Sequence, residues 1–158
     1  MAKEIERKFL LCSDSWKSQV VSSSYIKQGY LAATGATVRV RLLENQAFLT
    51  IKGKQSGLVR NEFEYPRPPE DAREMLSLLS AYPPVEKYRH IVPAENGLVW
   101  EIDEYLGDNA PLFTAEIELP EPDTEFDIPE WLGAEVSGDG KYTNRSLSRF
   151  PFSLWQEE

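Results

Sequence analysis

The sequence predicts a mainly β fold of the α+β class, with antiparallel strands and a few helices. Eight segments alternate apolar with charged or polar residues, which is the period of a strand whose two faces meet different surroundings. Turn signals join several of these segments, the clearest being Asn96-Gly97. One stretch, 70–81, instead carries apolar residues at helical spacing. Strands joined by tight turns run antiparallel, so the expected sheet is antiparallel.

The predicted strands follow this alternation. In chain order they span residues 4–10, 25–31, 37–42, 47–52, 59–65, 85–92, 98–105 and 112–119. In the third of them, Arg39 and Arg41 share one face, and Val38, Val40 and Leu42 share the other. The same division into a charged face and an apolar face recurs in most of the other strands.

Helices are predicted where capping residues precede an apolar stretch. Ser13-Asp14-Ser15 can cap a short helix over 16–20, and the helix 70–81 begins with acidic residues and ends before Pro83-Pro84. A helical turn is expected at 130–133, and Thr143 can cap a final helix through Phe150. Loops and turns are expected at 22–24, Gly35, Asn45-Gln46, 53–57, 66–69, 107–109, 120–129 and 137–142.

Composition narrows the classes of function. The 158 residues, with no linker, predict a single domain spanning 1–158. The formal net charge of −9 argues against a nucleic-acid binder, and no apolar run is long enough to span a membrane. One cysteine, Cys12, and a charged first strand without a signal peptide predict a cytoplasmic protein. With His90 as the one histidine, a zinc site built from His and Cys is not expected.

The first strand places Glu4, Glu6 and Lys8 on one face. Two neighbouring carboxylates repel each other, and a hard divalent cation such as Mg²⁺ or Mn²⁺ relieves that repulsion. Taken alone, the pattern is more typical of a strand with one solvated, charged face.

The charged faces of the other strands extend this pattern, because most carry a pair of the same sign at a spacing of two. The basic members are Lys8, Arg39, Arg41, Lys52, Arg60, Lys87 and Arg89, and the acidic members are Glu4, Glu6, Glu62, Glu64, Glu101, Asp103, Glu116 and Glu118. Such pairs cost repulsion unless the opposite charge lies between the strands. A barrel with a charged lumen satisfies this, with helices over its apolar outer face. A sandwich with charged outer faces gives the same alternation, so the pattern leaves both open.

Taken in order, the motifs resemble those of the triphosphate tunnel metalloenzymes, the CYTH superfamily. They are Glu4-x-Glu6-x-Lys8, Gly29-Tyr30-Leu31, Arg39-x-Arg41, Leu49-Thr50-Ile51-Lys52, Arg60-x-Glu62-x-Glu64, Lys87-x-Arg89, Glu101-x-Asp103, Glu116-x-Glu118 and Gly138-Asp139-Gly140-Lys141-Tyr142-x-Asn144. The resemblance implies an eight-stranded antiparallel tunnel with a charged lumen and helices packed outside. It is strongest to the bacterial inorganic triphosphatases, which implies hydrolysis of inorganic triphosphate to pyrophosphate and phosphate with Mg²⁺ or Mn²⁺.

The resemblance also implies roles for individual residues. Phosphate oxygens are expected to be bound by Lys8, Arg39, Arg41, Lys52, Arg60, Lys87, Arg89 and Lys141. The expected metal ligands are Glu4, Glu6, Glu116 and Glu118. Four more acids, Glu62, Glu64, Glu101 and Asp103, are expected either to bind a second metal ion or to hold the basic residues in place.

The catalytic base is the least determined role. Tyr30 is the candidate acceptor of the proton of the attacking water, with the Lys52 ammonium favouring its phenolate. In the alternative, a second metal ion alone activates the water. His90 and Cys12 are expected to be structural, and the four tryptophans to pack or to dock helices.

Other functions remain open at this point. The same fold serves nucleoside or thiamine triphosphatases and CYTH-type adenylate cyclases, and a non-catalytic polyphosphate-binding module would keep the arginine clamp. The expected partner is a small-molecule triphosphate, with no nucleic acid and no membrane. The oligomeric state is open, a homodimer being one option.

Overall fold

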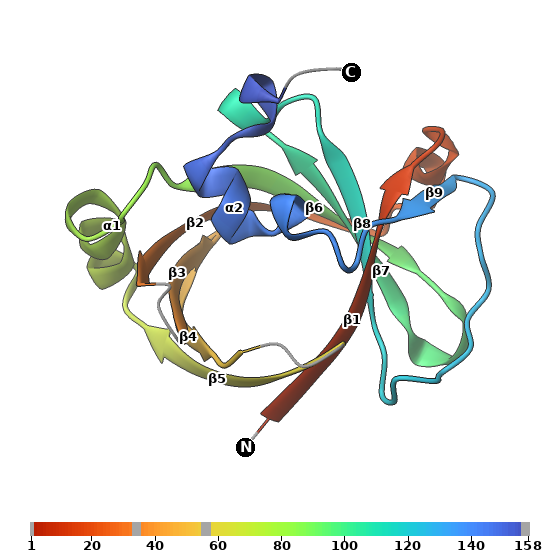
Figure 1. The fold of residues 1–158 in the computed structure, drawn as a ribbon, viewed down its shortest axis with the longest axis horizontal. Helices are drawn as coiled ribbons and strands as arrows, with labels where there is room; N and C mark the ends of the chain where they lie inside the picture. Colours follow the sequence, from red (N-terminus) through yellow and green to blue (C-terminus); the bar gives the residue numbers. More distant parts are fainter. Residues whose placement is uncertain (1, 33–35, 55–57, 156–158) are drawn as a thin grey trace.

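In the computed structural model, which describes residues 2–32, 36–54 and 58–155, nine strands form one antiparallel sheet that closes on itself (Figure 1). They are β1 (Ala2–Leu11), β2 (Ser22–Ala32), β3 (Thr37–Leu43), β4 (Gln46–Lys52), β5 (Val59–Arg67), β6 (Val85–Pro93), β7 (Val99–Tyr105), β8 (Phe113–Glu118) and β9 (Leu132–Glu135). Their order is β5-β4-β3-β2-β6-β7-β8-β1-β9, and an additional pairing of β5 with β1 closes an eight-stranded barrel. The alternation is therefore that of a barrel and not of a sandwich.

The first strand holds the barrel closed. Glu6 to Phe9 of β1 pair with β8 along one edge, while Ala2 to Ile5 pair with β5 along the other. Further along β1, strand β9 occupies the same edge as β5 and pairs with Phe9 and Leu11. One strand therefore contacts three others, and its inward side chains lie where the walls of the barrel meet.

Helices cover parts of the outer surface and one end. The helical segments are η1 (Ser15–Gln19), α1 (Pro69–Leu78), η2 (Glu95–Gly97), η3 (Gly107–Asn109), η4 (Gly140–Tyr142), α2 (Asn144–Arg149) and η5 (Phe152–Leu154), the η segments being 3-10 helices. Helix α1 lies on the outside of β3 and β4, where Ala72 and Leu76 pack against Val40 and Ala47. Figure 1 shows α2 and η4 across one end of the barrel.

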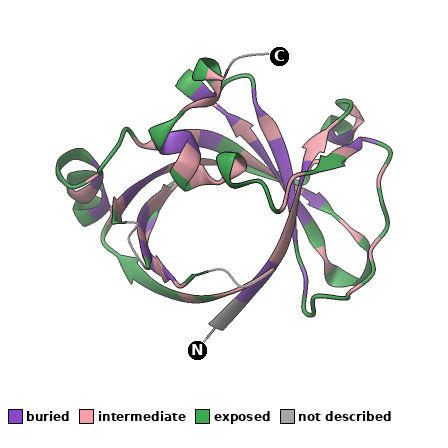
Figure 2. Cartoon of the chain, viewed as in Figure 1, coloured by how far each residue is buried: buried purple, intermediate pink, exposed green. Residues whose placement is uncertain are grey.

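Two of the three clusters of the hydrophobic core lie outside the barrel wall, and the third lies at the end of the barrel that α2 covers. The largest cluster joins the outer faces of β1, β7 and β8 to Trp16 and Trp131, with Trp100 at its centre. A third cluster fixes α2, whose Leu147 is buried against Val85 and Leu112. Figure 2 shows buried residues along β6, β7 and β8, and an exposed β5. Because the apolar faces point outward, the lumen is left to the charged side chains.

Most predicted elements are confirmed, with differences at their ends. Helix α1 ends at Leu78 and not at residue 81, because the chain turns and the Ala81 N–H donates to the Tyr30 carbonyl of β2. The turn after β3 lies at Glu44-Asn45, one residue earlier than expected, with Glu44 at φ 52°. Pro66 was expected to end the strand but lies inside β5, beyond the part of β5 that pairs with β1. A proline is tolerated there because that edge of the strand is unpaired.

Two predictions of secondary structure were wrong. Residues 22–24 were expected to be a loop but form the start of β2, paired with Ile91, His90 and Arg89 of β6. Residues 130–133 were expected to form a helical turn, but β9 begins at Leu132 and pairs with β1. The turn expected at Gly35 and residues 55–57 of the expected loop lie outside the described residues.

Candidate active site

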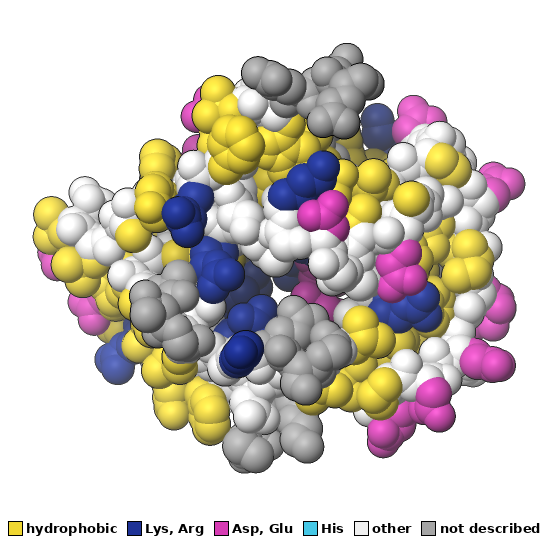
Figure 3. Space-filling model, viewed as in Figure 1, with side chains coloured by type: hydrophobic (Ala, Val, Ile, Leu, Met, Phe, Trp, Pro, Cys, Tyr) yellow, Lys and Arg dark blue, Asp and Glu magenta, His cyan; other side chains and the backbone are white. Residues whose placement is uncertain are grey.

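The lumen of the barrel is a cavity of about 690 Å³ lined almost entirely by charged and polar side chains. Figure 3 looks into its mouth, a hollow with Lys and Arg side chains around it. The predicted site residues that line it are Glu4, Glu6, Lys8, Tyr30, Arg39, Arg41, Lys52, Arg60, Glu62, Glu64, Arg89, Glu101, Glu116 and Glu118. Residues from all eight strands of the barrel thus meet in one space, and Lys87, Asp103 and Lys141 are the predicted residues that do not line it.

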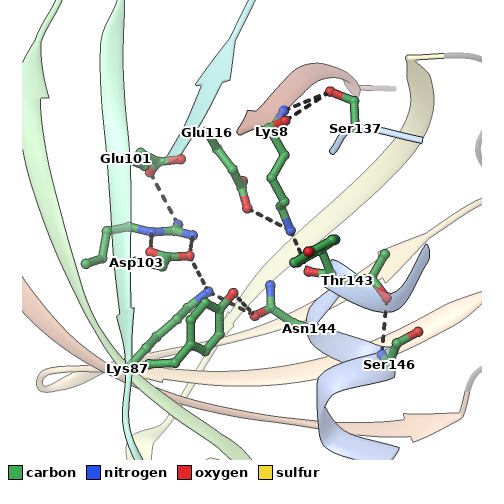
Figure 4. Close-up of polar contacts among 12 residues, drawn as sticks. Lys8, Lys87, Glu101, Asp103, Glu116, Ser137, Thr143, Asn144 and Ser146 are labelled. Carbon is green, nitrogen blue, oxygen red and sulfur yellow. Dashed lines mark hydrogen bonds and ion pairs between the residues drawn. The ribbon is translucent and has the colours of Figure 1, made fainter. Parts of the chain in front are cut away.

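Strand register brings the acids together. Glu6 lies opposite Glu118, and Lys8 lies opposite Glu116, in the pairing of β1 with β8. Because inward residues recur every second position, four carboxylates from two strands share one wall with a single ammonium among them. The Lys8 Nζ atom lies 3.2 Å from Glu116 Oε1 and relieves part of that repulsion (Figure 4).

The acidic wall holds protons that isolated carboxylates would not. Burial, followed by the charges of Glu116 and Glu4, raises the pKa of Glu6 well above its usual value. Burial also raises the pKa of Glu118. For Glu116, burial acts in the same direction but is outweighed by the charges of Lys8, Arg89 and Lys87, so its pKa is well below the usual value. Glu6 and Glu116 are therefore joined by a hydrogen bond in which one carboxyl keeps its proton.

A second carboxyl pair lies at β1 and β5. A hydrogen bond that the Glu62 carboxyl donates to Glu4, followed by burial, raises the pKa of Glu62 to about 7. Burial opposes ionisation of Glu4, but the hydrogen bond with Glu62 and the Lys52 ammonium lower its pKa below the usual value. Lys52 Nζ lies 3.0 and 3.2 Å from the two carboxylate oxygens of Glu4.

The donor set of the acidic wall fits a hard divalent cation, although its present arrangement is not a finished metal site. Within the described ranges, no three His, Cys, Asp or Glu side chains converge to hold a metal ion as they stand. The donors offered are carboxylate oxygens alone, and two of their pairs share protons that a cation would displace. Loading would require the carboxylates to turn toward one another and away from Lys8 and Lys52.

The opposite wall is basic, and among the residues that the structure describes neither Arg39 nor Arg41 forms an ion pair with an acid. Arg39 is buried, its Nε has no hydrogen-bond partner in the described part of the chain, and Arg41 donates from Nε to Gln28 Oε1 at 2.7 Å. Burial, followed by the charges of Arg39 and Arg89, lowers the pKa of Arg41 to about 9. Guanidinium groups crowded in this way favour an anion between them.

Arg89 is oriented by two acids of β7. Its Nε donates to Asp103 Oδ1 at 2.8 Å and its Nη1 to Glu101 Oε2 at 3.3 Å (Figure 4). Burial opposes the ionisation of Asp103, but the charges of Arg89 and Lys87 lower its pKa to about 2. Asp103 is therefore an ionised support beneath the cavity, with a side chain that has no exposed surface.

Lys87 also lies beneath the cavity. Its side chain is fully buried, and its Nζ donates to Asp103 Oδ2 at 2.7 Å and to Asn144 Oδ1 at 3.2 Å. Burial lowers the pKa of Lys87 to about 7; Asp103 opposes that shift, and Arg89 and Arg41 add to it. As it stands, Lys87 therefore binds protein groups and does not line the cavity.

Lys141, the third predicted residue that does not line the cavity, is exposed and points outward. Its Nζ lies 4.8 Å from the ring centre of Trp155 and 5.4 Å from that of Tyr142. Other parts of the late segment line the cavity instead, as do residues that the pattern of strands had not singled out. These additional lining residues are Thr37, Gly53, Lys54, Val136, Ser137, Asp139, Tyr142, Thr143, Asn144 and Arg145. Lys54 continues the alternation of Lys52 and could have been found by it, whereas Arg145 lies in α2 and carries no such signal.

The two residues proposed for proton transfer line the same cavity, but each forms its hydrogen bond with a different residue. The Tyr30 hydroxyl accepts a hydrogen bond from Gln28 Nε2 at 3.1 Å, while the Lys52 ammonium is held by Glu4. No hydrogen bond joins Tyr30 to Lys52 in the ranges that the structure describes.

His90 lies on the outer surface, as expected of a structural residue. Its ring bonds to Ser23 Oγ at 2.6 Å and to Glu104 Oε1 at 2.9 Å, and it packs 5.4 Å from the Trp16 ring. Cys12 is exposed and donates to backbone carbonyls of residues 130 and 132. Among the described residues, no helix has the length and apolarity needed to cross a membrane.

Comparisons with known proteins agree with the geometry. A sequence model of the CYTH domain family matches residues 2–149. An inorganic triphosphatase of Acetivibrio thermocellus is 41% identical over 158 residues, which are 99% of this chain and 100% of that protein. One of Nitrosomonas europaea is 32% identical over 149 residues, covering 92% and 96% of the two chains.

Solved structures show the same barrel. The crystal structure of an inorganic triphosphatase superimposes with a TM-score of 0.65 at 30% identity, over 94% of this chain and 95% of that one. A protein from Pyrococcus horikoshii OT3 matches with a TM-score of 0.60 at 20% identity, over 75% and 80% of the two chains, and shows the shared fold alone.

Proposed function

The chain belongs to the CYTH domain family, and from that premise we propose that it hydrolyses inorganic triphosphate to pyrophosphate and phosphate inside its barrel. The observation that carries this proposal is the set of residues that line the cavity, nearly all of which have charged or hydrogen-bonding side chains, with Val136 the one aliphatic side chain in the described part of the chain. An organic group such as a nucleobase binds through apolar and aromatic contacts. Such a lining favours a bare polyanion over a nucleoside or thiamine ester. The inorganic triphosphatases among its relatives support the same substrate.

Binding and orientation of the phosphates fall to the basic wall. Arg39, Arg41 and Arg89 present guanidinium groups to one space, and two of them are crowded by like charge until an anion enters. Transfer of a phosphoryl group from triphosphate to water, with pyrophosphate leaving, depends chiefly on positioning and on neutralising charge. Lys8, Lys52 and Arg60 extend the basic set along the cavity, so a chain of several phosphates would be gripped at more than one place.

Glu4, Glu6, Glu116 and Glu118 would hold Mg²⁺ or Mn²⁺, which when bound neutralises charge on the phosphoryl oxygens. Lys8 and Lys52, which now pair with two of these acids, would be released toward the phosphates. Glu101 and Asp103 support Arg89, and Glu62 shares a hydrogen bond with Glu4. Glu64 faces the same cavity with Thr50 beside it.

A proton must also leave the attacking water. In this proposal, Tyr30 Oη accepts it, and release of Lys52 from Glu4 would bring an ammonium to favour the phenolate. The hydroxyl is already an acceptor toward Gln28, whose own carbonyl oxygen is held by Arg41.

The test is phosphate release from a panel of inorganic triphosphate, ATP and thiamine triphosphate, each with Mg²⁺ and then Mn²⁺. The proposal expects turnover of inorganic triphosphate well above that of the two esters, stopped reversibly by a chelator. Cyclic AMP and pyrophosphate from ATP would instead identify a cyclase. Tight triphosphate binding without turnover would identify a binding module.

The metal assignment has its own variant within that assay. Glu6→Ala should abolish turnover while the fold survives, because it removes a ligand and also relieves repulsion on the acidic wall. Glu74→Ala, an exposed carboxylate of α1, is the matched control and should behave as the parent. Calorimetric titration with Mn²⁺ should show weakened binding for the first variant alone. Retained activity of Glu6→Ala at saturating Mg²⁺ would remove the assignment.

A further inference from the structure

Asn144 begins helix α2, and its amide oxygen is held by two donors from the barrel wall (Figure 4). Tyr105 Oη donates to Asn144 Oδ1 at 2.8 Å, and Lys87 Nζ donates to the same atom at 3.2 Å. An amide oxygen accepts two hydrogen bonds, so its capacity is filled. A flipped amide would set its NH₂ group against the Lys87 ammonium, which has no lone pair to offer, so the orientation is fixed.

The amide nitrogen is consequently directed to the other side. Asn144 lines the cavity, and Figure 4 shows its nitrogen pointing away from Lys87 toward the side where Lys8 and Glu116 lie. In the part of the chain that the structure describes, no group accepts a hydrogen bond from Asn144 Nδ2. The side chain therefore offers the lumen a neutral donor with two protons.

The segment that carries this donor is held from several directions. Lys8 Nζ donates to the Tyr142 carbonyl at 3.0 Å, and the Thr143 hydroxyl accepts from the Ser146 N–H at 3.1 Å as the cap of α2. Leu147, in the next turn, is fully buried against the barrel. Lys87 is itself anchored by Asp103. Donors fixed before the substrate arrives cost no reorganisation when it binds.

We propose that Asn144 contacts the bound phosphate chain through Nδ2, and that Lys87 is the positioning residue that holds its amide. The inference rests on the proposed function, since it needs triphosphate in the cavity. Lys87 then serves the substrate through Asn144 and not by direct contact with phosphate. The late segment contributes a substrate contact from outside the strands, where the alternation of charges gives no signal.

The test compares Asn144→Asp, Asn144→Ala and the matched control Asn45→Asp, an exposed turn residue. Asn144→Asp keeps an acceptor for Lys87 and Tyr105 but removes the donor. Its melting temperature should stay near that of the parent while KM for triphosphate rises. Loss of a hydrogen bond to a charged group predicts a rise of about tenfold to a hundredfold. Asn144→Ala should raise KM similarly without adding charge, and Asn45→Asp should change neither quantity.

Lys87→Met tests the positioning role in a double-mutant cycle. It should raise KM on its own and add nothing further in combination with Asn144→Ala, because both act through one contact. Parent KM in both Asn144 variants would overturn the inference, as would a rise confined to Asn144→Asp, which would indicate repulsion alone. Additive effects of Lys87→Met and Asn144→Ala would remove the positioning role. Absence of triphosphate turnover in the parent protein would instead count against the proposed function.

Discussion

At the level of single residues, the two walls of the cavity differ in how their charges are met. Glu4 is paired with Lys52, and Glu116 with Lys8. Arg39 has a buried Nε without a partner in the described ranges, and Arg41 is bonded to a neutral amide. Because an uncompensated buried charge is costly, the basic wall gains most from an anion. The acidic wall gains from a cation for the same reason.

Removal of the hydroxyl oxygen of Tyr30 distinguishes its proposed role as a base from a role in packing alone. Tyr30→Phe should lower kcat by roughly 10²–10⁴-fold, the usual contribution of a general base, with KM and the metal requirement kept. The parent's rate is expected to rise toward alkaline pH as the phenol ionises, and in Tyr30→Phe that rise should disappear. Steady-state kinetics across pH would measure both, with Tyr65→Phe on exposed β5 as the control. If Tyr30→Phe keeps its rate and its alkaline limb, another group accepts the proton.

Residue alternation predicted which side chains face the lumen, but not how far along the barrel each lies. Lys87 and Arg89 share a face, yet only Arg89 lines the cavity. Lys87 lies nearer the end that α2 covers, and Asn144 reaches it there. A period of two fixes a face and carries no information about what closes the end of a barrel. The position of Lys141 could not be predicted by alternation either, because it lies outside the strands, where side chains do not alternate between two faces.

At the level of elements, pairing with a neighbouring strand determined the structure of the two segments whose secondary structure was predicted wrongly. Three serines at 22–24 are typical of a loop, but β6 offers them a complete ladder. Trp131 and Leu132 sit beside β1, whose free edge above β5 accepts β9. Strand formation depends on such neighbours more than on intrinsic preference, so local sequence could not show it. The eight barrel strands were predictable because each has a long, two-sided pattern.

The close packing of helix α1 against the sheet depends on a glycine of β2. A Cβ atom built on Gly29 would lie 2.5 Å from Ser80 Oγ and 2.8 Å from Leu76 Cδ2. Gly29→Ala should therefore push the helix end away and cost about 1–3 kcal/mol, as overpacking does. For a chain of this size that lowers Tm by roughly 2–10 °C.

Thermal melts followed by circular dichroism would measure that loss. Gly53→Ala is the matched control, because its added Cβ would lie 3.7 Å from Asn61, an ordinary contact. Equal Tm values for the two variants would show that α1 is not seated against Gly29.

At the level of the whole molecule, the choice between a barrel and a sandwich rested on closure, which alternation cannot reveal. The pairing of β1 with β5 is the single contact between strands that turns an open sheet into a tunnel. The alternation predicted which residues share each face of a strand. The resemblance of the ordered motifs to a known family predicted that the sheet closes into a barrel. The net charge of −9 did not foretell the site either, because basic side chains gather around the mouth (Figure 3).

A cavity with such walls should be stabilised by its ligand. A ligand that binds only the folded state stabilises it by about 2.7 kcal/mol at a hundred times its Kd. Inorganic triphosphate should therefore raise Tm more than single phosphate at the same concentration and ionic strength, since it spans several basic residues. Differential scanning fluorimetry would measure the two shifts. Equal shifts would mean that the basic residues act singly and do not form one extended cradle.

The position of β1 has a consequence for how the molecule is made. Lys8 and Glu6 lie far from Glu116 and Glu118 along the chain, so neither pair exists until β8 has been synthesised and has paired with β1. Contacts between such distant segments form slowly, because a long loop must close first. A nascent chain that stops short of β8 would carry the arginines of β3 and only the β1 half of the acidic wall. During refolding, recovery of catalysis would therefore mark the closing step itself, later than the return of strand signal in circular dichroism.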